Sequence, residues 1–390
     1  MSIKLDYKPV VVLTDYMYDS IQPFQDVYDR AGFEFRPYQC KTAEEIIQVA
    51  KDADAVQVHF AKITKEIIDA LPKCRLIVRS AVGMDNIDVA AATAAGIPVA
   101  NVPDYGIEDV STHAILLMLA ITKKFNILTR TVQEGMWDYA VTKPVHRIQN
   151  RVFGLMGCGA IARCAAKKAQ AFGMRVIAYD PYLKQDQVND LDIILKSAKE
   201  VAQESDVVSV HLPLTSETKE IIDREFFGWM KPGAFLINTA RGGVIQERDL
   251  LQALQTGQIA GAGLDVLSQE YIEKDDPLLQ MNNVIITPHA AWYSEEAEFT
   301  LLTSAAEEVV RGLNGEPLKH HSIKSHMQNS FKFEIKIPEG STMKKYDKEF
   351  IKKNMYSGVL CDVMDEMGYR NQCIGKELMP LKDDTVIFGP

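Results

Sequence analysis

The chain has 390 residues, of which 47% are hydrophobic and 25% charged, values typical of globular proteins and sufficient for two or three domains. Its formal net charge of −10 argues against a partner that is a nucleic acid or an anionic membrane, although a small anionic substrate needs only local positive charge. The start lacks the apolar core of a signal peptide, and no apolar run is long enough for a membrane span. The sequence contains no Cys-x-x-Cys pair of the kind that binds zinc. We therefore expect a cytoplasmic protein without a metal.

Residues 9–105 alternate between patterns of strands and patterns of helices. The apolar runs 9–15, 55–60 and 76–83 predict buried strands. Residues 42–53 have helical spacing, with Thr42 where an N-cap belongs, and residues 89–96 predict a short helix that ends at Gly96. Such alternation predicts a parallel sheet that is covered on both faces.

A long buried helix is predicted for residues 108–124, followed by a polar segment, 125–150, in which Trp137 is the only large anchor. A second α/β region then begins at Arg151 and contains six strand-like segments. Residues from Glu295 to about Asn314 predict a further helix. The texture changes beyond about Gln328, where the chain reads as the opening of another domain.

The stretch "LMGCGAIA" matches a dinucleotide-binding turn between a strand and a helix. Gly157 would make the tight turn, Gly159 would let the backbone approach a pyrophosphate, and Ala162 would allow close packing of the helix. The start of the helix offers free N–H groups to phosphates. Asp180, at the end of the next strand, would accept hydrogen bonds from ribose hydroxyls and repel a 2′-phosphate, which favours NAD over NADP. A packing role for the small residues is the alternative.

Three side chains with the chemistry of keto-acid reduction follow successive strands of the second region. Arg241 can bind two oxygens with a permanent charge, and His289 can donate a proton near neutral pH. Glu270 beside the histidine would favour the imidazolium. Singly, each has an ordinary structural explanation, but the three together at one sheet edge predict a catalytic site.

In its motifs from Pro9 to Lys324, the chain resembles the D-isomer-specific 2-hydroxyacid dehydrogenases. The resemblance rests on the glycine turn, "VGMDNIDVAAATAAGIPVANVPDYG", "VSVHLPLTSET", "LINTARGGVI", "AGLDV" and "NVIITPHAAW". It implies a Rossmann NAD domain, residues 106–293, inserted into a flavodoxin-like substrate domain, residues 1–105 and 294–327. The fold class expected is thus α/β with two doubly wound parallel sheets, plus a partial C-terminal segment, residues 328–390.

The same resemblance implies a role for each matching residue. Arg241 would hold the carboxylate and keto oxygen of a small 2-keto acid, Glu270 would partner His289, and His289 would donate the proton. The backbone of Val82 and Gly83 would hold the carboxylate. The residues expected to bind NAD are Gly157, Gly159, Ala160, Ile161, Asp180, His211, Thr239, Ala240 and Asp265.

Several alternatives remain open at this stage. Arg79 could add charge for the substrate or form a structural salt bridge, and Trp292 could wall the substrate pocket or pack between domains. "HAAWYSEEA" and "YDPY" are similar to the C-terminal-binding-protein branch, which implies an NAD(H)-sensing binding protein as a second function. The resemblance also implies a homodimer. The tail is similar to the start of the ribonuclease-activity regulators and 4-hydroxy-4-methyl-2-oxoglutarate aldolases.

Overall fold

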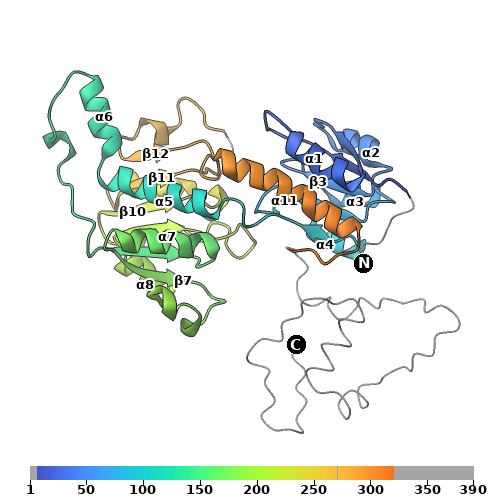
Figure 1. Ribbon diagram of the computed structural model, residues 1–390. Helices are drawn as coiled ribbons and strands as arrows, with labels where there is room; N and C mark the ends of the chain where they lie inside the picture. The colour runs from blue at the N-terminus through green and yellow to red at the C-terminus, as the bar shows by residue number, and fades with distance from the viewer. Residues whose placement is uncertain (1–6, 270, 320–390) are drawn as a thin grey trace, which may run out of the picture. The chain divides into compact units, whose positions relative to one another are not determined.

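Two parallel β-sheets organise the part of the chain that the computed structural model describes, residues 7–269 and 271–319 (Figure 1). Every pairing between neighbouring strands is parallel, and helices connect the strands. The described residues belong to one compact unit. The expected fold class, two doubly wound parallel α/β sheets, is confirmed. The predicted C-terminal segment, residues 328–390, lies outside the described residues.

The first sheet has the strand order β2-β1-β3-β4-β5, which is that of flavodoxin-like folds. Its strands are short, and the three central ones are almost wholly buried, because helices cover both faces. The strands are β1 (Val10–Leu13), β2 (Glu34–Pro37), β3 (Ala55–Val58), β4 (Leu76–Arg79) and β5 (Val99–Ala100). The connecting helices are α1 (Gln22–Ala31), α2 (Ala43–Ala50), α3 (Lys65–Asp69) and α4 (Val89–Ala94).

A helix from far along the chain completes this first layer. Helix α11 (Glu295–Leu313) lies beside α1 in Figure 1, and its residues Leu301 and Val309 share a hydrophobic cluster with strands β1 and β4. The approach is close, since a Cβ on Gly312 would lie 2.5 Å from Leu76. Ser294 caps the helix by accepting a hydrogen bond from the Ala297 amide.

The second sheet has the order β12-β11-β10-β9-β6-β7-β8. Its first six strands along the chain, β6 to β11, take the Rossmann order, and the switch point lies between β6 and β9. Its strands are β6 (Val152–Met156), β7 (Arg175–Tyr179), β8 (Ile193–Leu195), β9 (Val207–Val210), β10 (Ala234–Asn238), β11 (Ile259–Leu264) and β12 (Val284–Ile286). Its helices are α5 (Ile107–Thr122), α6 (Phe125–Gln133), α7 (Ala160–Ala171), α8 (Ala198–Glu204), α9 (Arg224–Trp229) and α10 (Glu247–Gln255).

Helix α5 is the core helix of this second layer, as its apolar composition predicts. Its buried residues lie against β10 and β11. Gly263 in β11 allows this contact, because a Cβ there would lie 2.9 Å from the Cβ of Leu117.

The structure differs from the predicted elements in several places. Helix α1, strand β2 and strand β8 were not predicted, and the two strands are short edge strands whose residues are partly exposed. Trp137 was expected to anchor the segment after α5, and this is wrong, since its side chain is 92% exposed. Among the described residues, no helix is long and apolar enough to cross a membrane.

Candidate active site

The predicted catalytic residues of the second sheet lie in the loops that follow its strands. Arg241 follows β10 and His289 follows β12, while Asp265, which was expected to bind the cofactor, follows β11. In parallel sheets the carboxyl ends of the strands share one edge, which is where ligands bind. The third catalytic prediction, Glu270, lies outside the described residues.

Arg241 reaches from the second sheet to the loop after β4 of the first sheet. Its Nε lies 3.5 Å from Oδ1 of Asp85, and its Nη1 donates to the carbonyl of Ala240 at 2.8 Å. A Cβ built on Gly83 would lie 2.1 Å from Arg241 Nη2, so only a glycine admits the guanidinium at this position. Residues more than 150 positions apart in the chain therefore meet at one point.

Arg79, at the end of β4, shares the same carboxylate. Its Nη1 lies 3.2 Å from Oδ1 of Asp85, its Nε donates to the carbonyl of His59, and its side chain is only 8% exposed. Burial lowers the pKa of Arg79, but a guanidinium keeps its charge. Burial raises the pKa of Asp85, and the charges of Arg241 and Arg79 outweigh that effect, so that its pKa lies below the usual range. The carboxylate is ionised between two guanidiniums.

Side chains that follow strands of the first sheet form hydrogen bonds with the neighbouring backbone. Asn101 donates to the carbonyl of Val82 at 2.6 Å, which fixes the loop expected to hold a carboxylate. His59 is buried behind that loop, with its Nδ1 3.0 Å from the carbonyl of Ser80 and 2.7 Å from the Tyr18 hydroxyl. Burial lowers the pKa of His59 to about 4, so its imidazole is neutral at neutral pH.

His289 occupies a tight turn with a left-handed backbone, φ 52°, which is uncommon for a residue with a side chain. Its amide donates to the carbonyl of Asp265 at 2.8 Å. The carboxylate of Asp265, 1% exposed, accepts hydrogen bonds from the amides of Ala290 and Ala291 and from the hydroxyl of Thr287. Asp265 thus braces the turn that presents His289, and its contact with a cofactor stays a prediction.

The glycine turn joins β6 to α7 at the switch point of the second sheet. Gly157 has φ 93°, and a Cβ on it would lie 2.8 Å from the carbonyl oxygen of His211 after β9. Gly159 is the N-cap of α7, and a Cβ on it would meet nothing within 4 Å. The first helical residues, Ala160 and Ile161, receive no side-chain cap from Gly159. An open helix N-terminus of this kind suits a phosphate group.

The remaining predicted cofactor residues surround the same edge. Asp180, directly after β7, accepts hydrogen bonds from the amides of Cys158 and Tyr182, both at 3.0 Å. Thr239, after β10, has a buried hydroxyl with no hydrogen-bond partner in the described structure, so it has hydrogen-bonding capacity to offer a ligand at this edge. The other two are Ala240 and His211. The amide of Ala240 donates to the side chain of Asn238. The Nε2 of His211 lies 2.9 Å from the Ser209 hydroxyl, and burial lowers the pKa of His211 to about 4.

Trp292, the last of the predicted substrate residues, makes packing contacts. Its ring lies 6.1 Å from that of Tyr105 and 5.6 Å from that of Tyr293, both edge-on. It also packs against the hydrophobic cluster of the first sheet. These contacts fit the packing alternative, and a part in substrate binding stays a prediction.

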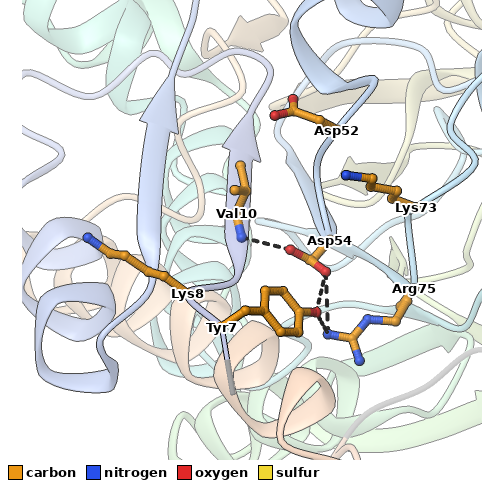
Figure 2. Close-up of a pocket in the computed structure, with 7 residues that line it drawn as sticks. All are labelled: Tyr7, Lys8, Val10, Asp52, Asp54, Lys73 and Arg75. Atoms are coloured by element: carbon orange, nitrogen blue, oxygen red, sulfur yellow. Dashed lines mark hydrogen bonds and ion pairs between the residues drawn. The ribbon is translucent and has the colours of Figure 1, made fainter. Parts of the chain in front are cut away.

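A separate pocket of about 400 Å³ lies at the opposite, amino-terminal end of the first sheet's strands (Figure 2). Asp54 is the centre of its hydrogen-bond network: its carboxylate accepts hydrogen bonds from the Tyr7 hydroxyl at 2.5 Å and the Val10 amide at 2.9 Å, and lies 3.6 Å from Arg75. This network ties the segment before β1 to the sheet. Its place, away from the carboxyl ends of the strands, separates it from the candidate active site.

Two carboxylates of the site were not singled out from the sequence. Asp85 was quoted in "VGMDNID" without a role, and Asp15, after β1, accepts hydrogen bonds from the amides of His59, Phe60 and Ala61. Position directly after a buried strand was the available signal for Asp15. No comparable signal marks Asp85, because its partners come from two different sheets.

The chain is similar in sequence to known proteins. Residues 115–291 match the family model of the D-isomer specific 2-hydroxyacid dehydrogenase, NAD binding domain. A glyoxylate reductase of Korarchaeum cryptofilum is 39% identical over 275 residues, covering 70% of this chain and 83% of that protein. A D-3-phosphoglycerate dehydrogenase of Methanocaldococcus jannaschii is 38% identical over 277 residues, and there the match spans 70% of this chain but only 52% of the relative.

Solved structures agree with the fold. The D-lactate dehydrogenase from Aquifex aeolicus, complexed with NAD and lactic acid, superposes with a TM-score of 0.73 at 28% identity, covering 78% of this chain and 96% of that one. The similarity therefore includes both sheets.

Proposed function

Because the chain belongs to the D-isomer-specific 2-hydroxyacid dehydrogenases, a family of NAD-dependent oxidoreductases, we propose that it interconverts small 2-keto acids and 2-hydroxy acids at the edge where Arg241 meets Gly83. That meeting carries the proposal, since it supplies a permanent cation beside the backbone of Val82 and Gly83. Relatives are named for glyoxylate and for phosphoglycerate, so members of the family differ in the side chain of the substrate that they bind.

The residues present fit the cofactor. The uncapped N-terminus of α7 suits a pyrophosphate, the open space beside Gly159 admits it, and the unpartnered hydroxyl of Thr239 offers a hydrogen bond. Asp180 lies where ribose hydroxyls would be bound, and its charge favours NAD over NADP. When bound, the reduced nicotinamide supplies the hydride.

In the proposed reaction Arg241 binds the substrate's carboxylate and polarises its keto oxygen, with the amides of Val82 and Gly83 completing the carboxylate site. The carbonyl carbon accepts the hydride while His289 gives a proton to the oxygen, so that a 2-keto acid becomes a 2-hydroxy acid. Glu270 is proposed to hold the imidazole of His289 in its protonated form.

A steady-state assay of NADH oxidation at 340 nm with glyoxylate, hydroxypyruvate and pyruvate tests this function. We expect turnover with at least one of them, and its loss in His289→Gln while binding of NADH, followed by its fluorescence, is retained. Binding of NADH without turnover of any keto acid would contradict the proposal.

We further propose that the chain forms a homodimer through the arm that follows α5, defined as residues 125–141. Its side chains expose apolar surface of the kind that marks interfaces: Phe125 (59% exposed), Val132, Met136, Trp137 (92%), Tyr139 and Val141. Light scattering should give a dimer, and Trp137→Glu should give a monomer, with Tyr182→Glu as a control at another exposed aromatic residue.

The same measurement addresses the second function that the resemblance implied, an NAD(H)-sensing binding protein of the C-terminal-binding-protein branch. That function predicts a dimer that forms only with NADH and negligible keto-acid turnover. A dimer that forms equally well with and without NADH, together with rapid turnover of a keto acid, supports the enzyme.

A further inference from the structure

Helix α5 places a histidine, His113, against the turn that presents His289. Nε2 of His113 lies 2.9 Å from the hydroxyl oxygen of Thr287, which follows β12, and 3.6 Å from Oδ1 of Asp265, which follows β11. The side chain of His113 is 17% exposed, and that of Asp265 is 1% exposed. A helix and two strands that are far apart in the chain therefore meet in one shielded group of polar side chains.

The direction of each hydrogen bond in this group follows from the number of hydrogens available. Thr287 has one hydroxyl hydrogen, and it donates this hydrogen to Oδ1 of Asp265 at 2.5 Å. Its oxygen is then left to accept, so Nε2 of His113 carries a hydrogen and is the donor. His113 thus orients the hydroxyl of Thr287 toward the carboxylate, and hydrogen bonds linked in this way strengthen one another.

The carboxylate at the end of this chain of hydrogen bonds holds the His289 turn. Oδ1 of Asp265 also accepts a hydrogen bond from the amide of Ala290, and its Oδ2 accepts one from the amide of Ala291, both at 2.9 Å. The backbone of His289, directly before them, has φ 52°, and a conformation of this kind persists only where its surroundings over-determine it. The position of the Asp265 carboxylate therefore helps to set where the imidazole of His289 lies.

We propose that His113 is a positioning residue: through the hydroxyl of Thr287 it fixes the carboxylate that holds the His289 turn. This inference rests on the proposed function, because the imidazole that it positions is the proposed proton donor. The carboxylate of the keto acid is proposed to bind at Arg241, and the phosphates of NADH at the start of α7, so the main anchors of both ligands lie elsewhere. Loss of the His113 hydrogen bond should therefore lower kcat far more than the affinity for either ligand.

Two substitutions of equal length separate the hydrogen bond from the bulk of the side chain. Methionine and glutamine are both unbranched, but only glutamine offers a hydrogen to Thr287. In the full-length protein with NADH and the best keto acid, His113→Met should lower kcat at least tenfold. KM for the keto acid and the dissociation constant of NADH, followed by its fluorescence, should change less than threefold. His113→Gln should keep kcat within threefold of wild type.

A double variant tests whether the two residues act through one chain. Thr287→Val keeps the shape of the side chain but removes the hydroxyl, so it should lower kcat at least as much as His113→Met. Because either change breaks the same chain, the double variant should be less than threefold slower than Thr287→Val alone. His146→Met, at an exposed histidine outside this group, is the control and should keep wild-type kcat. Should His113→Met fail to fold, His113→Leu takes its place.

Hydrogen exchange of the turn gives a readout that does not depend on activity. The amides of Ala290 and Ala291 donate to Asp265, so their exchange, measured by mass spectrometry on the peptide that contains them, reports how firmly the carboxylate is held. Exchange should be at least tenfold faster in His113→Met and in Thr287→Val than in the wild type. It should be unchanged in His113→Gln.

The outcomes separate the two proposals. If the wild type reduces no keto acid, the proposed function fails, and unchanged exchange in His113→Met would then overturn the role of His113 as well. If a keto acid is reduced, the role of His113 is wrong when kcat of His113→Met stays within threefold of wild type or when His113→Gln is equally slow. It is also wrong when the factors of the two single variants multiply in the double variant. In these cases the enzyme activity stands.

Discussion

Replacing Gly83 by alanine should remove activity while leaving the fold intact. The added Cβ would lie 2.1 Å from Arg241 Nη2 and 2.7 Å from Asp85 Oδ1, whereas ordinary contacts begin near 3.4 Å. The guanidinium must therefore move by more than about 1 Å, and a displacement of about 1 Å at a substrate-positioning group can cost about 100-fold in rate. Both displaced atoms end flexible side chains, so we expect a small change in the free energy of unfolding, below about 1 kcal/mol.

The assay is kcat/KM for the best keto acid with NADH, measured together with the melting temperature. Gly228→Ala is the matched control, because that glycine lies in α9 and a Cβ there would meet nothing within 4 Å. The control should keep wild-type activity. A Gly83→Ala protein with kcat/KM within threefold of wild type would show that Arg241 does not bind substrate where the structure presents it.

Three further substitutions give separate readouts. His289→Gln should lower kcat by about 100-fold or more, the contribution typical of a general acid, with NADH affinity changed less than threefold in a fluorescence titration. Asp180→Asn, which still accepts the hydrogen bond from the Cys158 amide, should raise the NADPH/NADH ratio of kcat/KM at least tenfold, and an unchanged ratio would remove Asp180 from cofactor selection. His59→Gln should weaken the loss of stability at acid pH. The pKa of His59 is about 4 in the folded chain and about 6.5 in the unfolded chain, so between these values the unfolded chain binds a proton that the folded chain does not. The free energy of unfolding of the wild type should therefore fall by up to about 3 kcal/mol as the pH drops through that window. A wild-type melting temperature that is constant from pH 7 to pH 4.5 would contradict this.

The parts of the fold that were predictable share one physical property. Strands such as β1 and β3 are buried on both faces, so their sequences are continuous apolar runs that stand out from the surrounding helices. Strands β2 and β8 lie at sheet edges, where partial exposure permits polar residues, and the apolar signal is weak. The error at Trp137 is of the opposite kind. A large aromatic side chain favours burial, but the surface that buries it can belong to another chain.

The candidate site divides in the same way. The glycine turn and Arg241 were predictable because each follows a recognisable strand, and parallel strands end at one edge. The link from Arg241 to Asp85 was not, since it depends on how closely two sheets approach each other. The carboxylate of Asp265 illustrates a further limit: its position after β11 was evident, but its three hydrogen-bond partners in the His289 turn follow only from coordinates.

The polypeptide passes between the two layers twice, and the crossings are neighbours. A Cβ on Gly106, just before α5, would lie 3.7 Å from the Cβ of Trp292, just before α11, and Tyr105 touches the same ring. Residues 107–291 thus begin and end at neighbouring points, an arrangement that in general tolerates the insertion of a whole domain. We therefore expect that a short linker could replace this segment without opening the first sheet's layer, and that a cofactor-binding segment from another dehydrogenase could be grafted at the same junction.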